Sequence, residues 1–181
     1  MTDADQLTEL ALAAGRGDRA ALDRFIRASQ DDVWRTVAYL GDPGSADDLT
    51  QETFLRAIGA LPRFAGRSSA RTWLLSITRR VVVDQIRRNQ ARPRTTSQID
   101  LDSLLSTSPA AVRFEDVIEI RMLLDGLESN RRDALVLTQI LGLSYAEAAE
   151  VSGCPLGTIR SRVARAREDL IAAAQRDDCA G

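Results

Sequence analysis

The chain contains no histidine and no lysine among its 181 residues. Without histidine it lacks the commonest metal ligand and the commonest general base near neutral pH. Its 2 cysteines, Cys154 and Cys179, stand alone and form neither a C-x-x-C metal motif nor a disulfide framework. A phosphate-binding G-x-x-x-x-G-K-[ST] loop and a nucleophile elbow are also missing. These absences argue against a hydrolase or transferase, and we expect no catalytic residue, no metal and no cofactor.

Long apolar runs are missing as well. No uninterrupted stretch approaches the roughly 20 apolar residues that span a bilayer. The N-terminus, MTDADQLTEL, is acidic and has no basic segment followed by an apolar core, so it does not resemble a secretory signal. The composition, 44% hydrophobic and 28% charged, is that of a globular protein. We therefore expect a cytoplasmic protein with no membrane partner.

The charges that are present are strongly segregated. All 24 basic residues are arginine, and residues 63–94 hold 9 of them against one acidic residue, Asp84. Residues 1–62 and residues 95–130 each carry a net charge of −5, although the whole chain is only at −2. Guanidinium groups form planar forks that suit phosphates and base edges. The pattern indicates a nucleic-acid partner for the arginine-rich segment and a different partner for the acidic part.

Apolar residues recur at helical spacing along most of the chain, which predicts an all-α protein. We expect helices over 20–40, 45–61 and 70–89, with Ser45 as the N-cap of the second. A further helix is expected to start at Asn130 and to stop at Gly142.

Two small helical domains are predicted. Residues 93–112 are rich in Ser, Thr and Pro and have no steady periodicity, so they should form a flexible linker. The linker separates a first domain at 1–92 from a second at 113–176, and an acidic tail follows at 177–181.

The second domain contains a helix-turn-helix pattern. Ser144 and Glu147 have the spacing of a capping box, Gly153 lies in the short turn, and Pro155 suits the start of a second helix. On a wheel of that helix, one stripe is apolar: Leu156, Ile159, Val163, Ala166 and Leu170. The opposite side is polar and rich in arginine, as a recognition helix that enters the major groove must be. A solvated arginine face on an ordinary bundle helix is the alternative.

These segments resemble a known family. GLSYAEAAEVSGCPLGTIRSRVARAREDL (142–170) is similar to region 4 of the bacterial extracytoplasmic-function (ECF) sigma factors. DDLTQETFLRAIGAL (47–61) resembles their region 2.2, and RFAGRSSARTWLLSITRRVVVDQIRR (63–88) resembles regions 2.3 and 2.4. Within the family the likeness is greatest to the mycobacterial sigma factor C group. The resemblance implies a sigma region 2 bundle and a sigma region 4 helix-turn-helix, and a factor that directs promoter-specific transcription initiation by core RNA polymerase.

The resemblance also implies roles for residues. The β′ clamp helices of the polymerase would bind Asp47, Asp48, Gln51, Glu52, Thr53 and Leu55. Melted −10 DNA would contact Arg63, Phe64, Gly66, Arg67, Ser68, Arg71, Thr72, Trp73, Arg79 and Arg80, although core packing is favoured for Trp73. Duplex −35 DNA would contact Thr158, Arg160, Ser161, Arg162, Ala164, Arg165 and Arg167. The β flap of the polymerase and an anti-sigma factor are further implied partners.

Two other interpretations remain open. A helix-turn-helix regulator would explain the second domain and the arginines but not DDLTQETF, and it should dimerise on a duplex operator without polymerase. A protein-only adaptor would bind polymerase without directing initiation.

Overall fold

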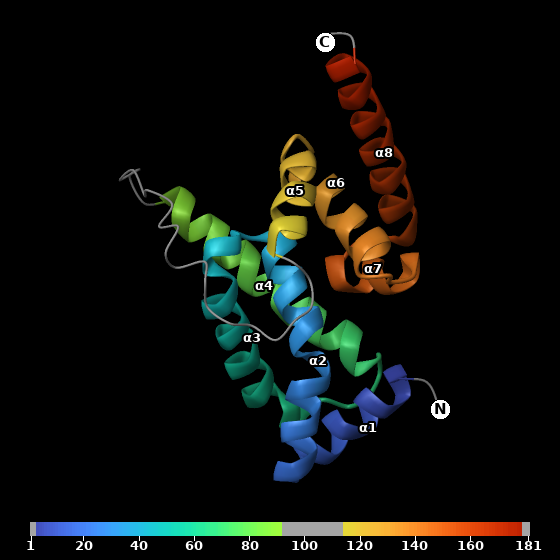
Figure 1. The fold of residues 1–181 in the computed structure, drawn as a ribbon. Coiled ribbons are helices and arrows are strands. Elements are labelled where there is room, and N and C mark those ends of the chain that lie inside the picture. Colours follow the sequence, from blue (N-terminus) through green and yellow to red (C-terminus); the bar gives the residue numbers. More distant parts are fainter. Residues whose placement is uncertain (1–2, 92–113, 179–181) are drawn as a thin grey trace. The chain divides into compact units, whose positions relative to one another are not determined.

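The computed structural model describes residues 3–91 and 114–178, and every regular element in these ranges is a helix (Figure 1). The all-α prediction is therefore confirmed for this part of the chain. Two compact units, Met1–Ala111 and Val112–Gly181, divide the chain. Their boundary falls inside the predicted linker 93–112, which itself lies outside the described residues. Among the described helices, none is long and apolar enough to cross a membrane.

Four long helices build the first unit. They are α1 (Asp3–Gly15), α2 (Arg19–Leu40), α3 (Ala46–Ala60) and α4 (Ala70–Ala91), with the single 3₁₀ turns η1 (Pro43–Ser45) and η2 (Leu61–Arg63) on either side of α3. Helix α2 packs against the other three, as Figure 1 shows. Apolar side chains from all four helices meet in one core that includes Leu7, Phe25, Phe54 and Leu74.

Helix α2 begins directly after Asp18, a residue type that is favoured as an N-cap. Asp18 is the N-cap, and its carboxylate accepts hydrogen bonds from the backbone N–H groups of Ala20 and Ala21 at 2.9 and 3.0 Å. Phe25, Val33 and Val37, which recur at helical spacing, are fully buried. The predicted start at residue 20 is thus correct within one residue.

Two predicted N-caps are wrong in detail. Ser45 precedes α3, but its side chain does not cap the helix; the hydroxyl instead donates to Asp42 Oδ2 at 3.2 Å. Asp42 is itself the N-cap of η1. The Ser45 side chain therefore bonds to the turn before α3, whereas the capping pattern predicts that it caps α3. In the second unit the helix begins at Ser129 and not at Asn130, because Glu128 accepts the backbone N–H of Asn130.

The second unit consists of α5 (Phe114–Asp125), α6 (Ser129–Leu135), the π-helical turn η4 (Val136–Ile140), α7 (Tyr145–Ser152) and α8 (Leu156–Asp178). The chain leaves η4 through Gly142, which has a positive φ of 68° at the predicted stop. Helix α8 continues through Asp178 and so includes the first two residues of the predicted acidic tail.

The predicted helix-turn-helix is present. Ser144 and Glu147 form the reciprocal capping box at the start of α7, and Gly153 ends that helix with φ 63° and ψ 39°. Ile159, Val163 and Ala166 of α8 are buried, as the helical wheel predicts. The two ends of the predicted stripe are less buried: Leu156, in the first turn of α8, is 38% exposed, and Leu170 is half-buried.

Candidate nucleic-acid and partner interfaces

An acidic and amide face lies along α3. Asp47, Asp48, Gln51 and Leu55 are exposed and Glu52 is half-buried, as a surface that meets a partner requires. Leu55 is 68% exposed, and Ile58, one turn further along the same helix, is 39% exposed. Thr53 differs from the rest: it is fully buried, and its hydroxyl donates to the carbonyl of Leu49 at 2.8 Å. Thr53 therefore supports the helix and does not reach the α3 face.

An apolar groove of about 410 Å³ runs beside this face, between α2 and α3. Its walls include Ile26 and Gln30 of α2 and Leu55 and Ile58 of α3. Neither Gln30 nor Ile58 was predicted as a site residue from the sequence. The available signal was the pair Leu55 and Ile58, whose spacing of three puts both apolar side chains on one helix face.

A network of ion pairs joins the α3 face to α4. Arg56 donates to Glu52 Oε1 on its own helix at 2.7 Å and to Asp84 Oδ2 on α4 at 2.9 Å. Its guanidinium holds the pKa of Asp84 below the usual range for an aspartate. Asp84 is the single acidic residue of the arginine-rich segment, and the structure brings it to the only arginine of α3.

The predicted −10 segment consists of the loop 64–69 and helix α4. Gly66 has a positive φ of 67° and lets the loop turn between Arg63 and Arg67, both of which are exposed. Ser69 closes the loop as the cap of α4, because its hydroxyl accepts the backbone N–H of Thr72 at 3.1 Å. Ser68 is half-buried beside it. Two exposed guanidinium groups thus lie here, that of Arg63 directly before the loop and that of Arg67 within it.

Three predicted contact residues on this segment pack inward to different degrees. The rings of Phe64 and Trp73 lie 4.8 Å apart at a tilt of 40°, and both pack against the core of the first unit. Core packing was favoured for Trp73 and is confirmed. Thr72 is only 1% exposed, and its hydroxyl shares a 2.8 Å hydrogen bond with that of Ser69. Thr72 therefore holds the loop end and offers no surface to DNA.

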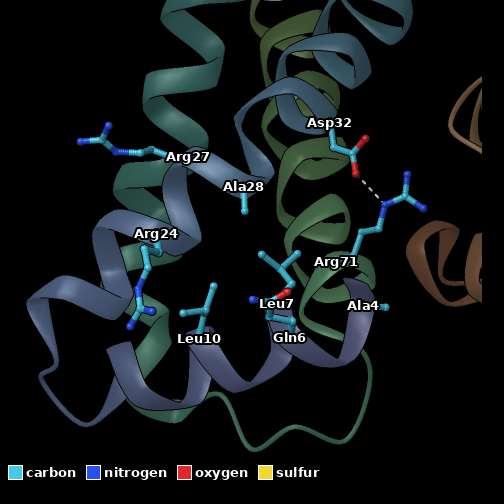
Figure 2. A pocket seen from close by; sticks show the side chains of 9 residues that line it. All are labelled: Ala4, Gln6, Leu7, Leu10, Arg24, Arg27, Ala28, Asp32 and Arg71. Atoms are coloured by element: carbon cyan, nitrogen blue, oxygen red, sulfur yellow. Dashed lines mark hydrogen bonds and ion pairs between the residues drawn. The ribbon is translucent and has the colours of Figure 1, made fainter. Parts of the chain in front are cut away.

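Arg71 lines a wide groove between α1, α2 and the start of α4 (Figure 2). Its guanidinium makes a 2.6 Å ion pair with Asp32 of α2, and the figure shows the two side chains pointing toward each other. The groove has a volume of about 920 Å³ and also carries Arg24 and Arg27. Further along α4, Arg80 is exposed and Arg79 is half-buried, so only Arg80 projects fully from the bundle.

Helix α8 presents the predicted recognition face. Arg160, Ser161, Ala164 and Arg165 are all exposed, opposite the buried stripe of the same helix. The Ser161 hydroxyl donates to the carbonyl of Thr158 at 3.0 Å, and Thr158 is half-buried. The arrangement is that of a helix free to enter a major groove with two guanidinium groups foremost.

Arg162 and Arg167 flank the apolar stripe of α8, and each forms a hydrogen bond to a neighbouring side chain. Arg162 donates to Cys154 Sγ at 3.6 Å, and Arg167 donates to Gln139 Oε1 at 3.0 Å. Cys154 is half-buried in the turn. Both side chains are thus held beside the outer face of α8.

Helix α8 is anchored to the rest of its unit by charge as well as by its apolar stripe. Arg131 of α6 makes a 2.6 Å ion pair with Asp169. Arg132 donates to the carbonyl of Leu124 at 3.1 Å and so ties α6 to the end of α5. Burial lowers the pKa of Arg132 from its ordinary value, yet nearby Asp125 counters that effect with an ion pair at 3.3 Å.

Comparisons with known proteins agree with this division. The family model for Sigma-70 region 2 matches residues 25–92, and the model for Sigma-70, region 4 matches residues 118–170. The ECF RNA polymerase sigma factor SigC of Mycobacterium tuberculosis is 58% identical over 180 residues, which cover 99% of this chain and 97% of that protein. The RNA polymerase sigma-H factor of Pseudomonas aeruginosa is 30% identical, with 97% of each chain covered.

Solved structures resemble the fold. CnrH, solved in complex with the cytosolic domain of CnrY, superimposes with a TM-score of 0.72 at 27% identity, covering 96% of this chain and 99% of that one. The sigma factor RpoE, solved with the anti-sigma factor NepR from Bartonella quintana, gives a TM-score of 0.66 at 24% identity, covering 84% and 96%.

Proposed function

The chain belongs to the ECF RNA polymerase sigma factors, and from this premise we propose how its two units share the work of promoter-specific transcription initiation. The first unit docks on core polymerase and captures melted −10 DNA, while the second binds duplex −35 DNA. This chain needs no covalent chemistry of its own, because the polymerase is the enzyme. The work therefore takes place where the polymerase is, in the cytoplasm.

Docking would use the α3 face and the groove beside it. The clamp helices of β′ would meet Asp47, Asp48, Gln51, Glu52 and Leu55. Acidic and amide groups steer a basic partner and fix its register, while the exposed leucine adds apolar area at the centre. Thr53, which is buried, would act only by supporting the helix.

The −35 element would be bound by α8. Arg160 and Arg165 would form hydrogen bonds to base edges, with guanine O6 and N7 as the best matched acceptors. Ser161 would contact a base edge and Ala164 a thymine methyl group. Arg162 and Arg167 would hold phosphates at the two borders of the recognition face.

The −10 element would be captured as a single strand. Loop 64–69 offers exposed backbone and the exposed guanidinium of Arg67, Arg63 is exposed directly before it, and α4 continues the basic path through Arg80. Arg71 would take part by exchanging its partner Asp32 for a phosphate of the strand.

One observation supports the proposal most strongly. The two regions matched by the family models coincide with two helical units, and the second holds a capped helix-turn-helix whose outer face carries arginine. A helix-turn-helix regulator explains only the second unit. The exposed acidic face and apolar groove of the first unit fit a protein partner such as core polymerase.

The decisive experiment is run-off transcription with purified core RNA polymerase on pooled fragments of the source genome, with and without the protein. Discrete start sites that require the protein are expected, and the aligned upstream sequences would give the −35 and −10 motifs. If no new transcript forms although a control sigma factor is active on the same core, direct operator binding by a helix-turn-helix regulator replaces this proposal.

A protein partner that restrains the factor is also proposed. The similar structure of CnrH is a complex with the cytosolic domain of CnrY. An anti-sigma factor of this chain would cover surfaces that polymerase and DNA require.

A further inference from the structure

Helix α1 follows the −10 loop from one end to the other. In the turn η2 just before the loop, Leu61 lies so close to Gly15 that a Cβ atom on Gly15 would lie 2.6 Å from the Leu61 carbonyl oxygen. At the middle, the side chain of Leu12 lies beside Gly66. At the end, the hydroxyl of Thr8 accepts the backbone N–H of Ala70 at 3.0 Å. Three points of one helix therefore contact the turn before the loop, the loop itself and the first residue of α4.

The spacing of these contacts explains how one helix can make them all. Residues 8, 12 and 15 are separated by four and three positions, so they share one face of α1. Leu7 and Ala11 lie on the adjacent face and are buried in the core of the unit. The core thus holds α1 in place, and α1 in turn holds the loop.

A pocket of about 640 Å³ opens between the first turns of α1 and the second half of the loop. One wall carries the carboxylates of Asp5 and Glu9, and the other carries Arg67 and the hydroxyl of Ser68. The pocket therefore combines hydrogen-bond acceptors on one side with a cation on the other.

A nucleotide with an amino-bearing base matches this combination. Its phosphate would pair with Arg67, and the exocyclic amino group of adenine, cytosine or guanine would donate to a carboxylate. Thymine has no amino group, and its one ring donor, N3–H, lies between two carbonyl oxygens that a carboxylate repels. The acidic wall would thus discriminate against thymine.

We propose that α1 is part of the −10 recognition apparatus: Thr8, Leu12 and Gly15 hold the loop in position, while Asp5 and Glu9 select a base with an exocyclic amino group. The inference rests on the proposed function and deepens it. The region 2 family model begins at residue 25, so α1 lies outside the matched residues.

The test uses holoenzyme assembled from the full chain and core polymerase. Its probes are single-stranded oligonucleotides that carry the non-template −10 sequence found by run-off transcription. Each −10 position is replaced in turn by A, C, G or T. Wild-type holoenzyme should bind an amino-bearing base at one position about tenfold more tightly than thymine, the effect of one unsatisfied polar group in a pocket.

The variant Asp5→Asn/Glu9→Gln should bring that ratio close to one, because a side-chain amide can donate to thymine as well as accept from an amino group. Asp23→Asn is the matched control, since Asp23 is an exposed acid of the same unit, paired with Arg27 on α2. It should keep the wild-type ratio. A wild-type ratio near one, or an unchanged ratio in the double variant, would overturn the assignment of these carboxylates.

The positioning role has its own variant. Thr8→Val removes the acceptor for the Ala70 N–H and should weaken binding of every oligonucleotide several-fold, while the ratio of affinities for amino-bearing bases and thymine stays unchanged. Thr8→Ser keeps the hydroxyl and should restore the wild-type affinity. Equal affinity in Thr8→Val and wild type would disprove the positioning role. If wild-type holoenzyme binds no better than core polymerase alone, the proposed function itself fails; a failure confined to the variants removes only this inference.

Discussion

The indole N–H of Trp34 donates a hydrogen bond to Oδ1 of Asp47 at 3.0 Å. Trp34 is almost fully buried on α2, and Asp47 stands in the first turn of α3. The bond therefore joins the two helices that border the apolar groove. One carboxylate of the proposed docking face also has a structural role, whereas Asp48 lies exposed on the same turn.

This difference gives the first prediction. Asp47→Ala should lower the free energy of unfolding of the first unit by about 1 kcal/mol, because it leaves a nearly buried indole N–H without its acceptor. Asp48→Ala should leave that stability unchanged, while both variants weaken binding to core polymerase. Urea titration followed by tryptophan fluorescence measures the effect, since both tryptophans of the chain lie in the first unit. Asp47→Asn keeps an oxygen acceptor and should behave like wild type in the titration; equal losses in Asp47→Ala and Asp48→Ala would contradict the assignment.

The Arg56 network gives a pH-dependent prediction. The hydrogen bond that Arg56 donates to Asp84 lowers the pKa of Asp84, so folding favours the charged form of this carboxylate. The stabilising contribution is present above the ordinary aspartate pKa of about 4 and is lost as the pH falls through the lower value of the folded state. The difference in melting temperature between wild type and Arg56→Gln should therefore shrink as the pH falls below about 4.

Salt provides the control for that experiment. The three side chains are 39–45% exposed, so added salt should screen their attraction and reduce the same difference at neutral pH. Arg27→Gln removes a more exposed pair with Asp23 and should have no measurable effect. A melting difference between wild type and Arg56→Gln that stays constant from neutral pH to pH 3 would rule out the Asp84 pair as its source.

Helices with strong local signals could be predicted from the sequence. Capping and turn conformations depend on contacts within a few residues, as at Asp18, Ser144 and Gly153. The apolar stripe of α8 follows from the spacing of its residues alone. The two failed caps have a common cause. Ser45 and Asn130 each stand next to an acidic side chain, Asp42 or Glu128, which takes the role that the pattern gave to the neighbour.

The site residues were harder to predict because burial depends on tertiary packing. Thr53 and Thr72 fall within motifs that resemble the family, yet both are buried and bond to their own helix or loop end. Helix α1 was not singled out at all. Its link to the loop is the hydrogen bond from Ala70 to Thr8 across 62 residues, a long-range contact that no local pattern contains.

The recognition helix gives a prediction about specificity. Arg165→Ala should weaken −35 duplex binding by the holoenzyme by about 1–3 kcal/mol and relax the base preference at one position. Arg162→Ala should weaken all sequences equally and reduce the salt slope by about one, as expected for a phosphate contact. Arg63→Ala, in the other unit, should leave −35 binding unchanged. Titration of fluorescent −35 duplexes at several salt concentrations separates these outcomes, and a base-specific loss in Arg162→Ala would reverse the two roles.

Two glycines of the helix-turn-helix should respond to alanine with opposite signs. Gly153 has a left-handed conformation, φ 63° and ψ 39°, so Gly153→Ala should destabilise the second unit by about 1–2 kcal/mol. Gly157 lies within α8 and an added Cβ would meet no atom within 4 Å, so Gly157→Ala should stabilise the helix by about 0.5–1 kcal/mol. Hydrogen exchange of peptides from α7 and α8 measures both effects in the full chain, where tryptophan fluorescence reports only on the other unit. Since the turn sets the angle between the two helices, Gly153→Ala should also weaken −35 binding. Faster hydrogen exchange in Gly157→Ala would contradict the predicted stabilisation of α8. Unchanged exchange in Gly153→Ala would show that this turn is not what holds α8 in place.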